Sequence, residues 1–501
     1  MPPTSYTRFL IRLLILVYGV HAFSYNFADV DLWGHLKFGQ EHYQTGSLAA
    51  TDPFSYTAPG HSWINHEWLS ELIFYVMFAL MGSTGLMVLK IGVGLFIIHI
   101  LSQWYFRNFT SLLAYGLTFF LLINVLEIGY GTRPYLFTYA FTAALVVLIY
   151  NHFEIQKTSV FWIPPMIILW INCHGGAVAG IAILGMVVVV ESLRCKLKGL
   201  QLPSYLIISL VASGIALLIN PYGHELLMFL VQTIPKPRMI SEWRPVELLG
   251  SNTGLLAFKV MAVFSIITLF LKKEKRPWEI ALVVCAVFFG FRHLRHTFIA
   301  GILLTPVFAT GLNILVDKLK QSGSVFLKVK PVYVATILVA LIVWQGSTVI
   351  FKLGPTRFQM MVDAKQFPVY AVRFMKENNL GGNVLVAFNW GEYLIWKLPN
   401  SKVSIDGRYW TVYPDNVILQ NFIFHRGMKY WDQMLSMYPH DIILTHYLNK
   451  DLENRKDWVK IYQDGTARIF IPVTNPPSPA LQKFQKRELV YNESAPSFYF
   501  P

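Results

Sequence analysis

Acidic and imidazole side chains crowd residues 28–71 of this 501-residue sequence, between two apolar segments. Asp29 and Asp31 come first, directly after the first apolar run. A carboxylate at a membrane interface is partly desolvated, so it readily accepts a proton from an attacking hydroxyl group. Asp31, with Asp29 as the alternative, is therefore the predicted catalytic base. The structural alternative for Asp31 is an N-cap of a helix that begins at Leu32.

A second group of polar residues lies later in the same stretch. Asp52 precedes Pro53, and His66 and Glu67 precede a short apolar run. The carboxylates of Asp31, Asp52 and Glu67 could together hold Mg²⁺ or Mn²⁺, or Asp52, His66 and Glu67 could bind substrate. A turn at Asp52 and a favourable helix dipole at Glu67 are the structural alternatives, and the sequence does not decide between them.

Arginine and histidine side chains occur in other turns between apolar runs. The turn FRHLRH contains Arg292, Arg295 and His296, and arginine is suited to bidentate phosphate binding where the dielectric constant is low. Arg133 in GTRPYLF and His174 in NCHGG could orient the same ligand. We therefore predict that these residues bind substrate. Contacts with anionic lipid head groups, snorkelling and helix capping are the structural alternatives.

The elements that must position these residues are membrane-spanning helices. Hydrophobic residues make up 54% of the chain, charged residues make up 14%, and the mean hydropathy is +0.45. These values lie outside the range of soluble globular proteins. The net charge of +14 comes from small basic clusters between apolar runs, which fits the positive-inside rule better than nucleic-acid binding. The three cysteines lack the spacing of a disulfide framework or a zinc site.

Eleven apolar runs of helical length are predicted to span the membrane. They cover about 9–27, 84–106, 111–128, 134–151, 160–172, 177–193, 203–219, 254–271, 277–291, 297–315 and 331–351. A further run at 69–81 is short for a span, and we expect it to lie in the interface as part of the first outer loop. This arrangement collects most basic residues on one side, which the positive-inside rule assigns to the cytoplasm. The acidic stretch and FRHLRH then share the outer side.

The chain is predicted to contain two domains and a tail. Residues 1–353 form an all-α polytopic membrane domain, 354–472 form a small extracytoplasmic α/β domain, and 473–501 form a Pro-rich tail that we expect to be poorly ordered. Strands are expected at 383–388, 402–405, 441–445 and 467–471.

Several motifs resemble those of the GT-C class of integral-membrane glycosyltransferases. They are D-x-D-L-W-x-H at 29–35, T-D-P-F-S-Y-T at 51–57, W-I-N-H-E-W-L-S-E at 63–71, N-C-H-G-G, N-P-Y-G-H-E, and the C-terminal strings FNWGEYLIW and SIDGR. The chain resembles the protein mannosyltransferase and lipid A aminoarabinose transferase groups, and most of all their uncharacterised bacterial relatives. The resemblance implies a lipid-phosphate sugar donor and an acidic catalytic base in the first outer loop, at the position of Asp31 or Asp29.

The resulting hypothesis is a transferase that moves a sugar from a polyprenyl-phosphate-linked donor to an acceptor protein, lipid or glycan at the outer face of the membrane. We expect an integral protein of the bacterial cytoplasmic membrane, whose first loop and C-terminal domain lie outside the cytoplasm. Nucleic acid is not an expected partner, and no cofactor other than Mg²⁺ or Mn²⁺ is implied. The alternatives are a lipid-carrier flippase, which needs polar residues through the membrane depth, and a membrane-anchored binding protein, which would not need the loop acids.

Overall fold

The computed structural model describes residues 5–233, 241–249, 252–322, 331–354, 356, 358–446, 449–492, 494 and 496–501. The chain divides into two compact units. The first, here called the helical unit, comprises Met1–Tyr25 and Met87–Phe358. The second, here called the mixed unit, comprises Asn26–Leu86 and Gln359–Pro501. The first loop and the C-terminal region are far apart in the sequence, and they fold together.

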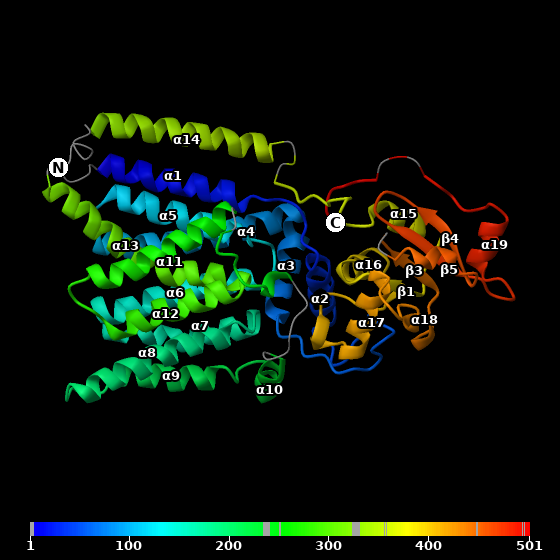
Figure 1. Cartoon of the computed structure of the whole chain (residues 1–501), viewed down its shortest axis with the longest axis horizontal. Coiled ribbons are helices and arrows are strands. Elements are labelled where there is room, and N and C mark those ends of the chain that lie inside the picture. The colour runs from blue at the N-terminus through cyan, green and yellow to red at the C-terminus, as the bar shows by residue number, and fades with distance from the viewer. Residues whose placement is uncertain are drawn as a thin grey trace. The chain divides into compact units, whose positions relative to one another are not determined.

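The helical unit is a bundle of apolar helices (Figure 1). Its described helices are α1 (Ser5–Phe23), α4 (Ser83–Asn108), α5 (Leu112–Glu127), α6 (Tyr135–Glu154), α7 (Ile163–Cys173), α8 (Ala177–Leu197), α9 (Ser204–Ala216), α10 (His224–Thr233), α11 (Thr253–Leu271), α12 (Pro277–Arg292), α13 (Thr297–Gln321) and α14 (Pro331–Leu353). Each predicted run overlaps one of these helices. Among the described residues, seven helices are long and apolar enough to cross a membrane, namely Ser5–Phe23, Ser83–Asn108, Tyr135–Glu154, Ala177–Leu197, Thr253–Leu271, Leu294–Gln321 and Val332–Leu353. The predicted all-α polytopic part is confirmed.

Helix α13 lies at the core of the bundle, where it packs against α5, α6, α11 and α12. Small residues allow this close approach, as is common between helices in membranes. A Cβ atom at Gly301 of α13 would lie 2.8 Å from a methyl carbon of Val125 on α5. At the edge of the bundle, α1 packs against α14, and Lys352 Nζ donates a hydrogen bond to the carbonyl of His21 at 3.2 Å.

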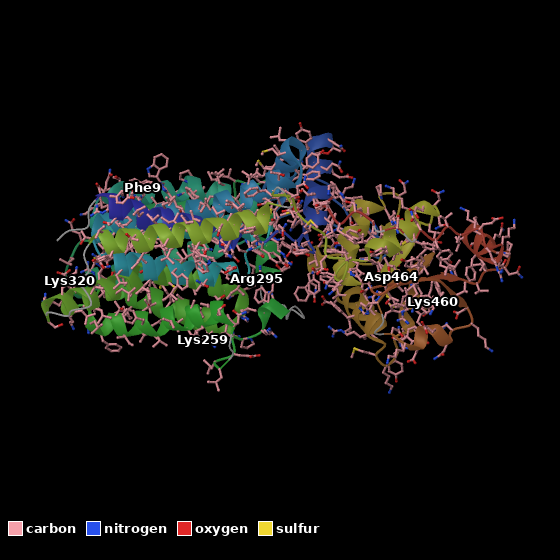
Figure 2. The ribbon with its side chains drawn as sticks, turned by 90° about the horizontal axis from the view of Figure 1, so that it is seen from above. Phe9, Lys259, Arg295, Lys320, Lys460 and Asp464 are labelled. Carbon is pink, nitrogen blue, oxygen red and sulfur yellow. The ribbon has the colours of Figure 1, made fainter. Side chains whose placement is uncertain are left out.

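The two ends of the helical unit differ in chemistry, and they are named here after Arg295 and Lys320, which lie at opposite ends (Figure 2). At the Lys320 end, Arg8 lies in the first turn of α1, and Arg107 and Arg194 lie in the last turns of α4 and α8. At the Arg295 end, Asn172 Nδ2 donates a hydrogen bond to the carbonyl of Ile219 at 2.8 Å, which joins the ends of α7 and α9. Arg295 lies between α12 and α13.

The mixed unit contains a five-stranded sheet in the order β2-β1-β3-β5-β4. The strands are β1 (Asn383–Val386), β2 (Lys402–Val403), β3 (Ile442–Thr445), β4 (Trp458–Gln463) and β5 (Arg468–Pro472). β1 pairs in parallel with β2 and β3, and β5 pairs antiparallel with β3 and β4. The four predicted strands are confirmed with shifted ends, and β4 was not predicted. Its sequence, WVKIYQ, places Lys and Gln among apolar residues, which weakens the strand pattern.

Helices cover this sheet and connect it to the first loop. They are α2 (Leu32–Thr45), α3 (Trp68–Met81), α15 (Val369–Glu377), α16 (Gly391–Lys397), α17 (Asp415–Arg426), α18 (Gln433–Met437) and α19 (Pro479–Gln485). Helix α2 packs against α3 and α16. Trp33 of α2 is fully buried against the rings of Phe367, Tyr393 and Phe500. The loop strand at Ser55 also bridges to Val403 of β2, so the first loop extends the C-terminal fold.

The tail after Pro472 is more ordered than predicted. It forms α19, whose Leu481 is buried, and the backbone amide of Phe500 donates a hydrogen bond to the carbonyl of Met360 at 3.0 Å. Asn378 receives a hydrogen bond from the amide of Val490 at 2.8 Å. The proline content suggested disorder, but apolar side chains that are spaced along the tail provide enough buried surface to hold it.

Candidate active site

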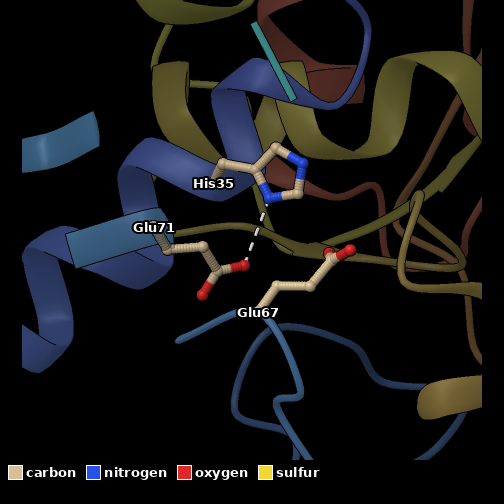
Figure 3. Close-up of side chains that lie close together, drawn as sticks. All are labelled: His35, Glu67 and Glu71. Carbon is tan, nitrogen blue, oxygen red and sulfur yellow. Dashed lines mark hydrogen bonds and ion pairs between the residues drawn. The ribbon is translucent and has the colours of Figure 1, made fainter. Parts of the chain in front are cut away.

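One imidazole and two carboxylates of the first loop converge in the mixed unit. His35, Glu67 and Glu71 each offer a ligand atom, and these atoms lie within 4.8 Å of one another (Figure 3). His35 Nδ1 lies 3.2 Å from Glu71 Oε1, and both side chains are buried. His66 is next to the group, with Nε2 at 3.7 Å from Glu67 Oε1. Of the residues that were predicted to hold a metal, Glu67 belongs to this cluster.

The close packing of α2 on α3 creates this cluster. A Cβ atom at Gly39 would lie 2.2 Å from the carbonyl oxygen of Glu71, so only glycine allows the two helices to approach here. Asn65 then fixes the acids, because its Nδ2 donates to Glu71 Oε2 at 2.5 Å and its Oδ1 accepts from the amide of Glu67 at 3.1 Å. The spacing of Asn65, Glu67 and Glu71 at the start of a helix therefore places three polar groups around His35.

Asp31 lies at the N-terminus of α2 beside a carboxylate from the C-terminal region. A Cβ atom at Gly407 would lie 2.7 Å from Asp31 Oδ1 and 2.5 Å from Glu392 Oε1, so both carboxylates touch this glycine. Glu392 is buried, and its Oε2 accepts a hydrogen bond from the amide of Gly34 at 3.1 Å. Asp31 is half-buried and makes no side-chain capping bond to α2. Its amide is bound by Asp29 Oδ1 at 3.1 Å, which makes Asp29 the positioning residue of the pair.

The electrostatic environment differs between these groups. Burial raises the pKa of Glu392 well above its ordinary value, and the nearby charges of Asp31 and Asp406 add to the shift. Burial lowers the pKa of His35, but the hydrogen bond that its ring donates to Glu71 and the charges of the surrounding carboxylates outweigh it, so the net pKa is raised. The protein therefore favours a protonated Glu392 and a protonated His35 among several acids.

Asp52 lies in a different cluster, in which it shares the Arg408 guanidinium with Asp406. Its Oδ1 lies 2.7 Å from Arg408 Nη1, and Arg408 also forms a bidentate pair with Asp406 at 2.9 and 2.7 Å. The amides of Phe54 and Ser55 donate to the Asp52 carboxylate at 3.0 and 3.2 Å. The Arg408 guanidinium is also surrounded by the rings of Phe38, Phe54, Trp63 and Tyr413. Since Asp52 is only 5% exposed, this placement favours the turn and packing alternative over substrate binding.

The predicted basic residues of the helical unit gather at its Arg295 end. Arg133 Nη1 lies 3.4 Å from Glu242 Oε1. His174 ends α7, and its Nδ1 accepts a hydrogen bond from the amide of Gly176 at 3.0 Å and contacts Thr138 Oγ1 at 2.8 Å. Trp170 Nε1 also donates to Thr138 Oγ1, at 2.8 Å. His174 is therefore held with Nδ1 as an acceptor, which leaves the proton of a neutral ring on Nε2.

The turn FRHLRH packs against the segment that contains Trp243. The Arg295 guanidinium lies 5.0 Å from the centre of the Trp243 ring, and His293 Nδ1 contacts the Trp243 carbonyl at 2.7 Å. The His296 ring lies 5.7 Å from the Trp243 ring, whereas Arg292 is exposed. Arg295 thus contacts the Trp243 ring and Arg133 contacts Glu242, whereas the Arg292 side chain is exposed to solvent.

An apolar cavity of about 290 Å³ adjoins this turn in the helical unit. Residues of α8, α12 and α13 line it, including Ile183, Phe289 and Leu303. His296 is the one lining side chain with an ionisable ring. A cavity of this chemistry fits an apolar chain whose polar end lies near His296.

Sequence reasoning missed Glu392 as a site residue. The string FNWGEYLIW was noted for its resemblance to a family motif, yet its glutamate is the acid that faces Asp31. The sequence signal for Glu392 was a single carboxylate within an apolar segment. Such a residue is rarely buried unless it has a polar partner, so it indicates a buried polar cluster. Of the predicted site residues, Asp29, Asp31, His66 and Glu67 lie in the mixed unit. Arg133, His174, Arg295 and His296 lie in the helical unit.

No protein-family model and no curated protein sequence matches the chain. Solved structures do resemble it. The oligosaccharyltransferase of Archaeoglobus fulgidus in the apo form has a TM-score of 0.56 at 12% identity, over 87% of this chain and 69% of that one. The same organism's oligosaccharyltransferase AglB, in complex with an inhibitory peptide and a dolichol-phosphate, has a TM-score of 0.57 at 12% identity, over 95% and 75%. ArnT from Cupriavidus metallidurans in the apo state has a TM-score of 0.52 at 12% identity, over 94% and 99%.

These likenesses agree with the motifs of the first loop and extend over nearly the whole chain. They concern the arrangement of helices and of the C-terminal sheet. The chain shares the fold of the Archaeoglobus fulgidus oligosaccharyltransferase and of Cupriavidus metallidurans ArnT, which is the fold expected from the resemblance of its motifs to the GT-C class.

Proposed function

We propose that this protein transfers a sugar from a polyprenyl-phosphate-linked donor to an acceptor hydroxyl or amide at the outer face of a membrane. The observation that carries the proposal is the half-buried Asp31 carboxylate, which lies beside the buried Glu392 at Gly407 and is not used to cap α2. Two carboxyl groups in unlike environments provide one proton acceptor and one neutral acid. The GT-C fold supports glycosyl transfer as the reaction class.

Asp31 is the proposed base. It takes the proton of the acceptor hydroxyl, whose oxygen forms a bond to the anomeric carbon of the donor sugar. The bond between that carbon and the phosphate oxygen breaks, and its electron pair leaves with the lipid phosphate, as in inverting sugar displacement. Glu392, whose pKa is raised by burial, keeps its proton, so that Asp31 is the ionised member of the pair.

The Arg295 end of the helical unit would bind the donor phosphate. Arg295 and Arg133 offer guanidinium groups that match phosphate oxygens, and His174 and His296 add imidazole donors. The cavity lined by α8, α12 and α13 would hold the first isoprene units of the carrier. Developing negative charge on the leaving phosphate is stabilised by the arginines. Arg292 is exposed and has a smaller proposed role.

A divalent cation fits the cluster of His35, Glu67 and Glu71 better than the predicted set that included Asp52. The cluster offers one imidazole and two carboxylates within 4.8 Å, a donor set that suits Mn²⁺ more than Mg²⁺. A bound cation would supply positive charge beside the acids of the first loop. Deprotonation of His35 would accompany binding, since the metal takes the neutral ring.

Mass spectrometry of glycolipids and glycoproteins tests the proposal. We compare membranes of the host with and without the chain, and with the chain carrying Asp31→Asn. The expected result is one sugar modification that depends on the wild-type chain and is absent with the variant. A product that forms equally with Asp31→Asn at equal protein level would contradict the role of Asp31. Translocation of a lipid carrier without any new glycoconjugate would favour a flippase instead.

A further inference from the structure

A second cavity lies at the Lys320 end of the helical unit, the end opposite Arg295. It has a volume of about 390 Å³ and is lined by α1, α4 and α5. Arg8 and Arg12 from α1, His99 and Ser102 from α4, and Tyr115 from α5 form its polar wall. Figure 2 shows Phe9, which also lines the cavity, on the side of the helical unit away from Arg295. Nothing in the proposed sugar transfer uses these residues.

The two arginines of this cavity carry positive charge that the described chain does not neutralise. They lie one helical turn apart, and both guanidinium groups approach the Phe106 ring, at 5.6 Å for Arg8 and 5.1 Å for Arg12. Neither forms an ion pair with a described carboxylate, and Arg8 Nε is buried with no hydrogen-bond partner among the described residues. Buried donors normally have an acceptor, so Arg8 Nε is a candidate hydrogen-bond donor to a bound ligand.

Hydroxyl groups complete the polar wall. Ser102 Oγ and Tyr115 OH lie 2.9 Å apart and form one hydrogen bond, in which either atom can donate. The hydroxyl that accepts in this bond keeps its own proton for a ligand. The cavity therefore offers two guanidinium groups and a hydroxyl donor, a set that suits the oxygens of a phosphate group.

The remaining wall is apolar and open. Phe9 is 60% exposed and Leu16 is 36% exposed, and both line the cavity along α1. A soluble anion would make no favourable contact with these exposed apolar side chains, whereas the acyl chains of a lipid would pack against them. We propose that the cavity binds the phosphate of an anionic phospholipid, with Arg8 and Arg12 on the phosphate and the acyl chains along Phe9 and Leu16.

This lipid is distinct from the proposed sugar carrier. Helix α1 has 19 residues and rises roughly 1.5 Å per residue, so it is on the order of 28 Å long. Its first turns carry Arg8 and Arg12, and its last turn lies at the other end of the unit. A head group in this cavity therefore belongs to the opposite leaflet from one bound near Arg295. The inference goes beyond the proposed function and does not depend on it.

The experiment measures lipid binding to the full, purified and delipidated chain by native mass spectrometry, with phosphatidylglycerol as the probe. Wild type should bind one molecule tightly. Arg8→Gln combined with Arg12→Gln should weaken that binding about 30-fold, because each basic residue near the surface contributes about a fivefold factor. Lys318→Gln combined with Lys320→Gln removes the same charge from the same end, and it should change binding less than threefold. Equal binding by wild type and the arginine variant would overturn the proposal.

Additional binding experiments distinguish a phospholipid from other sources of a phosphate group. Arg12→Lys keeps the charge but loses the planar fork, and it should bind with intermediate affinity. This variant keeps the proposal testable if the double variant fails to fold. Phosphatidylcholine should bind at least about tenfold more weakly, because its head group has no net charge. Competition by millimolar inorganic phosphate, or stronger binding of undecaprenyl phosphate than of phosphatidylglycerol, would overturn the assignment to a phospholipid.

Discussion

Two clusters of carboxylates in the mixed unit contain the same residue types, but their carboxylates have different partners. In one, Asp52 and Asp406 surround Arg408, and every partner is buried. In the other, Asp31 lies beside Glu392. His35 lies close to Glu67 and Glu71, and the cluster of these three residues contains no arginine or lysine. The first cluster gives both of its carboxylates the Arg408 cation as a partner. The second keeps acids close together, and Asp31 there is half-buried.

The difference shows that the partner of an acid decides its role. Arg408 fixes the carboxylates of Asp52 and Asp406 and lies among aromatic rings, so no acid there can accept a proton from a substrate. Glu392 is a partner of another kind, because burial raises its pKa well above the ordinary value and so favours its neutral form. An acid beside a neutral acid remains available for chemistry, whereas an acid bound to arginine holds the fold together.

The largest expected effect is the loss of Arg408. Arg408→Met leaves the buried Asp52 and Asp406 without their cation, and breaking a buried ion pair in this way costs about 3–5 kcal/mol. We expect a clear decrease in the Tm of the purified protein, measured by intrinsic fluorescence in detergent. Arg426→Met, at an exposed position with a ring contact to Phe422, is the control and should leave the Tm nearly unchanged. A Tm for Arg408→Met equal to that of wild type would show that the cluster does not support the fold.

Loss of Arg295 should affect donor use and spare stability. A charge-assisted hydrogen bond to phosphate contributes about 1.5–3 kcal/mol, so Arg295→Gln should reduce kcat/KM for the lipid-linked donor about 10-fold to 100-fold. Arg292→Gln, at the exposed neighbouring position, should have a smaller effect. Measurement of transfer rates over a range of donor concentrations distinguishes the two. Equal effects of both variants would indicate a general head-group contact.

Asn65 should control cation binding, because it orients both Glu67 and Glu71. Removal of a residue that holds metal ligands typically weakens affinity about 10-fold to 100-fold. We therefore expect Asn65→Ala to weaken Mn²⁺ binding by that factor in calorimetry of the purified chain. Asn454→Ala lies away from the cluster and serves as the control. Absence of Mn²⁺ binding to wild type would remove the cation from the account.

The smallest effect concerns the pH dependence of stability. The raised pKa of Glu392 means that the folded protein holds a proton which the unfolded chain releases above about pH 4.5. Stability should thus be fully present below that pH and decrease as the pH rises toward the folded-state pKa. Glu392→Gln stays neutral and should flatten the decrease in Tm between pH 5 and pH 8. Glu488→Gln, which is exposed, should keep the wild-type slope. An unchanged slope in Glu392→Gln would mean that Glu392 is ionised in the folded protein.

Much of the fold could be predicted because apolar runs have a simple signature. Every predicted run coincides with a helix, and the strands β1, β2, β3 and β5 follow from short β-branched and apolar segments. The strand β4 and the ordered tail were missed, since their stability comes from partners far along the chain, as with Phe500 against Trp33. Local composition carries no information about such partners.

The site could be predicted only in part for the same reason. Asp31, His66 and Glu67 could be singled out as candidates because one polar stretch of the sequence holds all three. Glu392 is 361 positions from Asp31 in numbering, and it meets the first loop only because Gly407 and Gly34 leave room for it. The role of Asp52 also depended on Arg408, which is far along the chain. The role of a charged residue can be assigned only when the residue that it contacts in the fold is known.

A single paired measurement tests the central claim most directly. Transfer of the sugar identified by mass spectrometry is measured for Asp31→Asn and Asp52→Asn, and each rate is divided by the amount of folded protein. We expect Asp31→Asn to fold with the wild-type Tm and to transfer sugar about 10²-fold to 10⁴-fold more slowly, because it has lost a general base. Asp52→Asn should have a lower Tm and a wild-type rate per folded molecule. A folded Asp31→Asn protein with wild-type transfer would contradict the account.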